Sequence, residues 1–228
     1  MYCGVYADTA GKKQSRFGDP GLRFSLPIGL NSLMARILKN QPPVTPKINR
    51  IHILGASGVG TTSIARRLAE RIDCQHFDSD DFYWRNTSPP YTVVYETQER
   101  QRRLSTALAS HRQWILSGSL CGWGDMFIPF FELVVYVYVE NETRLERIRH
   151  RESMRFGDAI LPGGDQYERY REFVEWAAAY ETSIDVSRNA VRHQQWLEKV
   201  NCPIVMVINH RTVDDAVNDI MAHMRMGN

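Results

Sequence analysis

The residues with the clearest chemical meaning form one glycine-rich segment, residues 55–62. An apolar run, residues 51–54, comes before it, and a helical pattern of apolar residues follows it. A strand, a glycine-rich turn and a helix are the context of a phosphate-binding loop, whose pattern is G-x-x-x-x-G-K-[ST]. Gly55, Gly60 and Thr62 match this pattern, whereas Thr61 stands where the lysine is expected. The sequence therefore predicts a triphosphate site that lacks its usual cation. The predicted contacts are Gly55, Ala56, Ser57, Gly58, Val59, Gly60, Thr61 and Thr62.

The chemistry of such a loop comes from its backbone. Gly58 and Gly60 permit conformations closed to other residues and leave no Cβ in the path of a phosphate. The exposed N–H groups can form an anion nest, and the start of the following helix adds its free N–H groups and its dipole. We expect the Thr62 hydroxyl to serve a magnesium ion. A plain glycine-rich turn of an α/β protein is the alternative interpretation.

Three carboxylates follow the second predicted strand, residues 74–77. Asp78, Asp80 and Asp81 would lie at the same edge of the sheet as the loop, where ligands bind in open α/β sheets. One could hold magnesium while another accepts the proton of an acceptor hydroxyl. Aspartates also commonly cap helices. We expect Asp80 or Asp81 to cap a helix and at least one other carboxylate to face the nucleotide.

Four arginines recur at spacings of three, four and four residues, which places them on one helical face: Arg144, Arg147, Arg151 and Arg155. They could supply the charge that is missing at Thr61. The alternative is a solvated charged face in which the arginines pair with neighbouring glutamates. A second stripe is aromatic, with Trp176, Tyr180 and Trp196, and we expect it to belong to the core.

The remaining pattern alternates predicted strands with predicted helices. The other strands are residues 114–117, 133–139 and 203–208, and the main helices are residues 97–110, 142–155, 167–180, 189–199 and 213–224. Such alternation implies an α/β fold with a parallel sheet and helices on both faces.

The loop GASGVGTT, followed about twenty residues later by F-D-S-D, resembles the adenylate kinase and shikimate kinase branch of P-loop proteins. The resemblance implies a three-layer domain whose five-stranded parallel sheet has the order 2-3-1-4-5, and binding of ATP (or GTP) with Mg²⁺. It implies that Asp78 serves the metal and that Asp80 contacts the acceptor. It also implies a lid at about residues 144–166, whose arginines Arg147, Arg151 and Arg155 close on the phosphates.

Residues 117–125 follow the third predicted strand and contain S-G-S-L-C-G-W-G-D. This stretch is similar to a segment of bacterial adenylate-kinase-like P-loop proteins. It lacks the glycine triplet of shikimate kinases, which argues against shikimate as the acceptor. Ser119 and Trp123 either line an acceptor pocket or belong to a glycine turn in which Trp123 is a packing lid.

Composition separates two parts of the chain, an N-terminal extension (1–46) and the P-loop domain (47–228). The extension holds five of the ten prolines and carries a charge of +4, which leaves −2 for the rest. It contains one short amphipathic helical pattern and ends in a Pro-rich linker. A near-neutral domain does not favour nucleic-acid binding, and no apolar run approaches a membrane span. The four cysteines form no C-x-x-C pair, so a cytoplasmic location is expected.

Together these features predict an ATP-dependent, kinase-like phosphotransferase that acts on a small hydroxyl, phosphate or nucleotide acceptor. The alternative is a nucleotide-binding module or slow NTPase without transferase activity, and Thr61 is its main support. The sequence contains no indication of the oligomeric state.

Overall fold

The computed structural model describes residues 48–209 and 212–225. Its centre is a five-stranded, fully parallel sheet in the order β2-β3-β1-β4-β5, which confirms the predicted fold class and strand order. The strands are β1 (Arg50–Gly55), β2 (Gln75–Asp78), β3 (Trp114–Ser117), β4 (Leu133–Tyr138) and β5 (Ile204–Ile208). The extension predicted for residues 1–46 lies outside the described residues.

Helices follow the strands, as the alternating pattern predicts. The longer helices are α2 (Thr61–Ile72), α4 (Thr97–Ala109), α5 (Asn141–Phe156), α6 (Tyr167–Ala178), α7 (Ala190–Leu197) and α8 (Val213–Arg225). The short elements are α3 (Asp80–Tyr83) and the 3₁₀ helices η1 (Asp125–Phe130) and η2 (Gly157–Ile160). None of the helices in the described part of the chain has the length and apolarity needed to span a bilayer.

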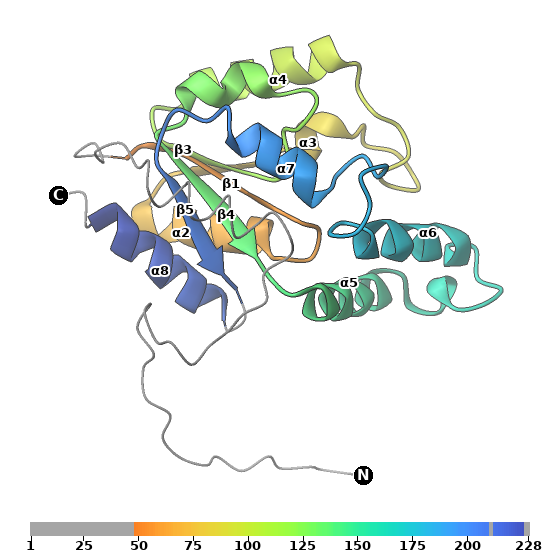
Figure 1. Cartoon of the computed structure of the whole chain (residues 1–228). Helices are drawn as coiled ribbons and strands as arrows, with labels where there is room; N and C mark the ends of the chain where they lie inside the picture. Colours follow the sequence, from red (N-terminus) through yellow and green to blue (C-terminus); the bar gives the residue numbers. More distant parts are fainter. Residues whose placement is uncertain (1–47, 210–211, 226–228) are drawn as a thin grey trace, which may run out of the picture.

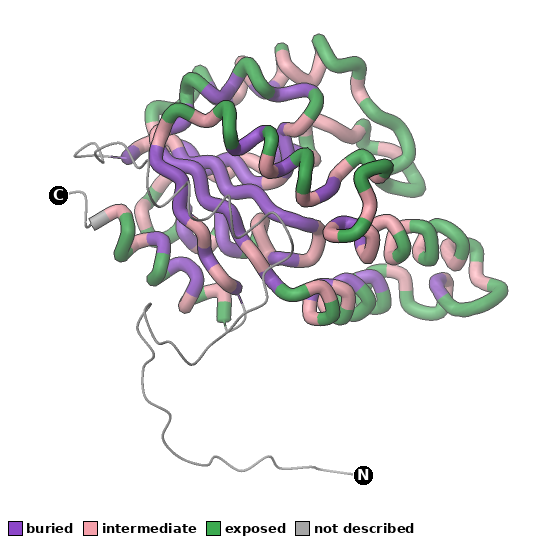
Figure 2. The backbone as a smooth tube through the Cα atoms, in the orientation of Figure 1, coloured by how far each residue is buried: buried purple, intermediate pink, exposed green. Residues whose placement is uncertain are grey.

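The helices cover both faces of the sheet, with α2 and α8 on one face and α4 and α7 on the other (Figure 1). Successive residues of a strand point to opposite faces, so β1 contributes to two cores. Ile51 and Ile53 pack in the core beside α2 and α8, whereas Leu54 packs in the core beside α4 and α7. The strands are buried along most of their length (Figure 2), as expected for a parallel sheet covered on both faces.

A buried histidine lies between these apolar side chains on the second face. His52 Nδ1 lies 3.0 Å from the carbonyl oxygen of Leu116, and its ring stacks on Phe131 with the centroids 4.8 Å apart. Burial lowers the pKa of His52 to about 4. The core therefore holds this imidazole in its neutral form at neutral pH.

Helices α5 and α6 extend beyond the carboxyl ends of the strands, on the side where the loop after β1 lies (Figure 1). Most predicted boundaries agree with the structure to within two residues. Strand β2 runs one residue further than predicted, because Asp78 pairs in register with Ser117. The first of the three carboxylates is therefore held by the sheet and does not belong to a free loop.

The prediction for the aromatic stripe is right for two of its three members. Tyr180 and Trp196 are buried, with exposed fractions of 5% and 2%. Trp176 is only partly buried and lines a cavity, so its assignment to the core was wrong. Helical spacing placed Trp176 on the inner face of α6. Because α6 extends beyond the edge of the sheet, this face borders the cavity there and not the core.

Candidate active site

The glycine-rich loop joins β1 to α2 at the carboxyl edge of the sheet. Gly58 and Gly60 have φ angles of 86° and 92°, in the left-handed region that favours glycine. Gly60 is also the N-cap of α2. A Cβ at position 58 would lie 2.6 Å from the carbonyl oxygen of Arg144. A Cβ at position 60 would lie 3.0 Å from Nδ2 of Asn209, so both positions need glycine for their conformation and have little space for a side chain.

Two side chains hold the carbonyl groups of this loop from outside. Arg144 Nη1 donates to the Ser57 carbonyl at 2.9 Å, and Asn209 Nδ2 donates to the Val59 carbonyl at 2.8 Å. In a trans peptide the N–H group points opposite to the carbonyl. The N–H groups of Gly58 and Gly60 therefore point away from these anchors, which is the arrangement that an anion nest requires.

Arg144 has a different environment from the other arginines of its stripe. Its side chain is fully buried beneath the loop and forms an ion pair with Glu181 at 2.7 Å. Its guanidinium also lies 5.3 Å from the centre of the Tyr180 ring. The spacing argument grouped Arg144 with arginines that were predicted to act from a lid, but the structure makes it a support of the phosphate-binding loop.

Thr62 and Asp78 meet at the start of α2. Thr62 Oγ1 donates to Asp78 Oδ2 at 2.7 Å, and Ser117 Oγ donates to the same oxygen at 3.2 Å. Hydroxyl and carboxylate oxygens suit Mg²⁺, which commonly binds through one or two protein groups, water and substrate phosphates. The described residues contain no group of three or more His, Cys, Asp or Glu side chains placed to hold a metal ion by themselves. The pair fits a magnesium site that water and phosphate oxygens would complete.

The expectation that Asp80 or Asp81 caps a helix was wrong. The N-cap of α3 is Ser79, which makes no side-chain capping bond. Instead, Asp78 Oδ1 accepts the N–H of Asp80 at 3.0 Å. Asp78 therefore contacts both the start of α2, through Thr62, and the start of α3, and the Asp80 carboxylate is not used for capping.

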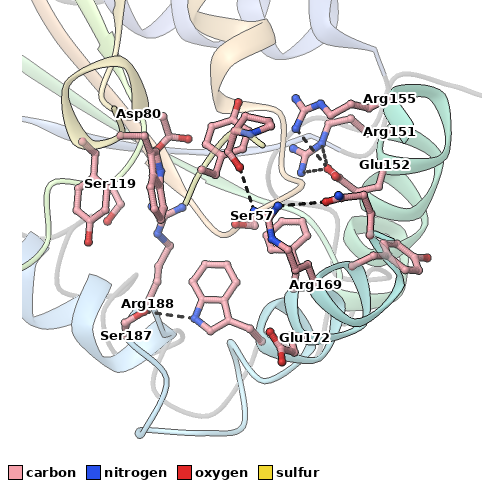
Figure 3. Close-up of a pocket in the computed structure, with 18 of the residues that line it drawn as sticks. Ser57, Asp80, Ser119, Arg151, Glu152, Arg155, Arg169, Glu172, Ser187 and Arg188 are labelled. Carbon is pink, nitrogen blue, oxygen red and sulfur yellow. Dashed lines mark hydrogen bonds and ion pairs between the residues drawn. The ribbon is translucent and has the colours of Figure 1, made fainter. Parts of the chain in front are cut away.

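A cavity of about 590 Å³ opens beside the loop. Ser57 lines it from the loop, Asp80 from α3 and Ser119 from the segment after β3. Arg151 and Arg155 line it from α5, across the cavity from Asp80 and Ser119 (Figure 3). Its volume is within the usual range of small-molecule sites.

The environment of Asp80 alters its acidity. Burial raises the pKa of the Asp80 carboxyl above its usual value, and the charges of Asp78 and Asp81 raise it further. Arg188 and Arg151 act in the opposite direction. A carboxylate with a raised pKa beside a cavity is a candidate proton acceptor for a bound hydroxyl.

The structure separates the three arginines predicted to act from the lid. Arg151 and Arg155 lie at the cavity, where both approach the buried Glu152, at 2.8 and 3.8 Å. Arg147 is not among the cavity residues, and its Nη2 donates to the carbonyl of Asn209 at 2.9 Å. Since Asn209 also anchors Val59, Arg147 lies near the other flank of the phosphate-binding loop. The catalytic roles of these arginines stay predictions.

Two further arginines line the cavity that sequence reasoning did not select. Arg169 Nη2 donates to the carbonyl of Pro90 at 3.0 Å and so ties α6 to the segment after α3. Arg188 lies in the connection between α6 and α7, with its guanidinium 5.7 Å from the centre of the Trp176 ring. Neither belongs to a motif or to the arginine stripe. The one feature of the sequence that could have pointed to Arg188 as a site residue is its position just before the helix predicted for residues 189–199.

The segment after β3 fits both interpretations that its sequence allowed. Ser119 and Trp123 both line the cavity. Trp123 is also packed, with 5% of its surface exposed and its ring 6.4 Å from that of Phe127. Ser119 Oγ lies 3.1 Å from Nε2 of His193, whose buried imidazole has its pKa lowered to about 3 by burial. The Ser119 hydroxyl is therefore held by a neutral imidazole.

The loop between β1 and α2, the strand order and the carboxylates past β2 define a P-loop NTPase of the adenylate kinase and shikimate kinase-like branch. A family model described as "AAA domain" matches residues 51–171, and the chain belongs to this family. The chain is also 37% identical over 174 residues to the uncharacterized protein YqaC of Bacillus subtilis (strain 168). That match covers 76% of this chain and 96% of YqaC.

Solved structures with a similar arrangement include two small-molecule kinases. A gluconokinase from Sinorhizobium meliloti 1021 has a TM-score of 0.46 at 14% identity, covering 82% of this chain and 94% of the gluconokinase. A shikimate kinase from Acinetobacter baumannii, in complex with shikimate, has a TM-score of 0.48 at 17% identity, covering 80% of this chain and 96% of that kinase.

Proposed function

We propose that this protein is an ATP-dependent phosphotransferase that transfers the γ-phosphoryl group to a small hydroxyl, phosphate or nucleotide acceptor. The observation that carries this proposal is the position of Asp80. Its carboxylate lines a cavity that also reaches the phosphate-binding loop at Ser57, and arginines lie on the opposite side. Phosphoryl transfer depends on such positioning and on cations around the transferred group.

Each part of the site has a role in this proposal. The N–H groups of residues 55–62 and the start of α2 bind the phosphates of ATP (or GTP). Thr62 and Asp78 would hold Mg²⁺, which when bound neutralises phosphate charge. Asp80 orients an acceptor hydroxyl and accepts its proton. Arg151 and Arg155 compensate for the absent lysine at position 61, with Arg147 at the other flank of the loop.

A nucleotide-binding module or slow NTPase is the second candidate. Two observations favour it: Thr61 carries no charge, and Arg151 and Arg155 both approach Glu152, which partly neutralises them. In this case ATP would bind and no acceptor would increase its turnover.

A cytoplasmic location is also proposed. It is supported by the scattered cysteines, of which the three in the described part of the chain are free thiols.

Binding of Mg-ATP to the wild-type chain and to Gly60→Val, measured by calorimetry, tests the first step of the proposal. A valine at position 60 would need a left-handed conformation, and its Cβ would lie 3.0 Å from Nδ2 of Asn209, which anchors the Val59 carbonyl. The loop should therefore lose its shape and binding should be lost. Circular dichroism serves as the folding control. Equal ATP affinity in a folded Gly60→Val variant would contradict a nucleotide site at this loop.

A further inference from the structure

The cavity beside Asp80 has an aromatic lining that the proposed phosphoryl transfer does not require. Eight of its lining side chains are aromatic, and they come from segments that are far apart in the sequence. The phosphate-binding loop contributes only Ser57 to this lining. The aromatic part of the cavity therefore lies mainly on the acceptor side of the site.

One aromatic wall follows α3. The ring of Trp84 lies 5.0 Å from that of Tyr83 and 5.9 Å from that of Tyr91, in edge-to-face arrangements. Trp123 joins this wall through Tyr83, at 6.2 Å. These contacts hold the rings in position, so they can receive a flat ligand at little entropic cost.

The second wall belongs to α6. The rings of Phe173 and Trp176 stack with their centroids 5.9 Å apart and their planes 23° apart. Trp176 Nε1 donates to Ser187 Oγ at 3.3 Å, a bond visible in Figure 3. Together with Arg188, which lies over the indole, this bond fixes the orientation of Trp176.

Asp80 and Ser119 lie together at one end of the cavity, opposite Arg151 and Arg155 (Figure 3). Ser119 is fixed by His193, which is in turn bonded to the Tyr180 hydroxyl at 2.7 Å. A ligand that uses both regions needs a flat apolar part and a hydroxyl at one end. A saturated polyol has no aromatic ring to lie against the two aromatic walls, so it would make less use of them.

Building on the proposed function, we propose that the acceptor is a planar aromatic ring that carries a hydroxyl group on a short arm, as a nucleoside does. The ring lies against the walls that contain Trp84 and Trp176, and the hydroxyl meets Asp80. The hydroxyl oxygen forms a bond to the γ-phosphorus of ATP, and the bond from that phosphorus to the β–γ bridging oxygen breaks. The hydroxyl proton passes to the Asp80 carboxylate, and ADP leaves.

The first experiment measures binding to the full chain without ATP. Adenosine, cytidine and thymidine serve as probes, with ribose and shikimate as controls that lack an aromatic ring. At least one nucleoside should bind ten or more times more tightly than either control. Base–aromatic stacking elsewhere contributes about 1–3 kcal/mol per base, which is consistent with an effect of this size. Absence of binding by every nucleoside, or equal binding of ribose, would overturn the inference.

Variants of Trp176 identify the surface that recognises the ring. Trp176→Leu should weaken nucleoside binding at least tenfold, whereas Trp176→Phe should retain most of it. Phe130→Leu is the matched control, since Phe130 is exposed and does not line the cavity. ATP affinity should be unchanged in Trp176→Leu. An equal loss of ATP affinity would show that the walls hold the base of ATP and would overturn the acceptor assignment.

Transfer assays separate this inference from the proposed function. Gly60→Val should lose ATP binding and keep nucleoside binding. Transfer to a different acceptor without nucleoside binding would overturn only this inference. Transfer to a nucleoside monophosphate but not to the nucleoside would overturn the hydroxyl assignment. Nucleoside and ATP binding without any transfer would contradict the proposed function and the acceptor role together.

Discussion

At the residue scale, the site has an unusual distribution of charge around the expected phosphates. Thr61 removes the cation from the loop itself, while Arg151 and Arg155 stand across the cavity beside Glu152. An arginine supplied from a lid can replace charge stabilisation, and such arginines contribute large rate factors in other phosphotransferases. The activity of this chain should therefore depend on side chains far from the loop in sequence.

Removing either of the two arginines that line the cavity from α5 should slow transfer. Arg151→Ala or Arg155→Ala is expected to reduce the rate at least tenfold, about 1.4 kcal/mol in the barrier, because positive charge near the phosphates is lost. Thr61→Lys should restore part of this rate. Arg149→Ala, an exposed change on the same helix, is the control. Full activity in both variants would contradict a contribution of these arginines to transfer.

Asp80→Asn should separate activity from stability. Burial raises the pKa of Asp80, so in the folded protein its charged form is disfavoured. Between the unfolded and folded pKa values the native state binds more protons, and this contribution to stability falls as pH rises through that window. The neutral asparagine should therefore raise Tm at pH 7 while kcat falls and ATP affinity is kept. Parallel losses of Tm and activity would instead mark Asp80 as structural.

The pH profile of transfer by the wild-type protein provides an independent check of Asp80. A base must be deprotonated to accept a proton, so its raised pKa should shift the acidic limb of kcat upward from the usual carboxyl range. A limb at the ordinary aspartate value, in steady-state assays with saturating substrates, would argue against Asp80 as the base.

At the element scale, helix α5 combines support of the loop with formation of the cavity. Its first turn places Arg144 beneath Ser57, and its last two turns place Arg151 and Arg155 at the cavity. Helical spacing showed that these arginines share one face of the helix. It did not show which parts of the protein pack against that face. Glu181, the partner of Arg144, follows 37 residues later along the chain. Only the tertiary structure could bring the two together.

Arg144→Ala should destabilise the protein and loosen the loop. Its loss leaves Glu181 uncompensated, and breaking such buried pairs typically costs about 3–5 kcal/mol. Urea unfolding should show this loss, and calorimetry should show weaker ATP binding, because the Ser57 carbonyl loses its anchor. Arg149→Ala should change neither quantity. A fully stable Arg144→Ala variant would contradict a supporting role.

The same contrast between local and tertiary information explains what the sequence could predict. The strands were predictable because the apolar runs alternate with helical patterns, and the sheet order was implied by the family resemblance of the loop and of the F-D-S-D segment. The roles of Trp176 and Arg188 could not be predicted, because no local sequence pattern shows whether residues beyond the sheet edge border solvent, the core or a cavity. Asp78 was predicted as a metal ligand, but its bonds to Thr62 and to the backbone of Asp80 were not.

At the scale of the whole molecule, the side of the sheet covered by α4 and α7 contains two buried, neutral histidines, His52 and His193. Burial lowers the pKa of His52 to about 4 and that of His193 to about 3. His52 lies in the central strand, and His193 connects α7 to the cavity through Ser119. Protonation of these histidines at low pH should therefore disturb the packing of the core and the cavity together.

Stability should fall as pH decreases from about 6.5, the unfolded histidine value. Below pH 6.5 the histidines of the unfolded state become protonated, whereas the buried histidines of the native state stay neutral. The free energy of unfolding therefore decreases with falling pH until the folded pKa values are reached. Urea unfolding at pH 7 and pH 5 measures this slope. The double variant His52→Gln and His193→Gln should have a smaller slope, with exposed His223→Gln as control. An unchanged slope would contradict neutral burial of these rings.

The central claim is that this P-loop protein transfers a phosphoryl group to an acceptor. The most direct measurement is ADP formation from Mg-ATP by the wild-type chain, with and without nucleosides and other small hydroxyl and phosphate acceptors. We predict that at least one acceptor raises ADP formation tenfold or more, with one phosphorylated acceptor formed per ADP, and that Asp80→Asn abolishes the increase. Tight ATP binding with no acceptor-dependent ADP formation would contradict the claim and favour a nucleotide-binding module.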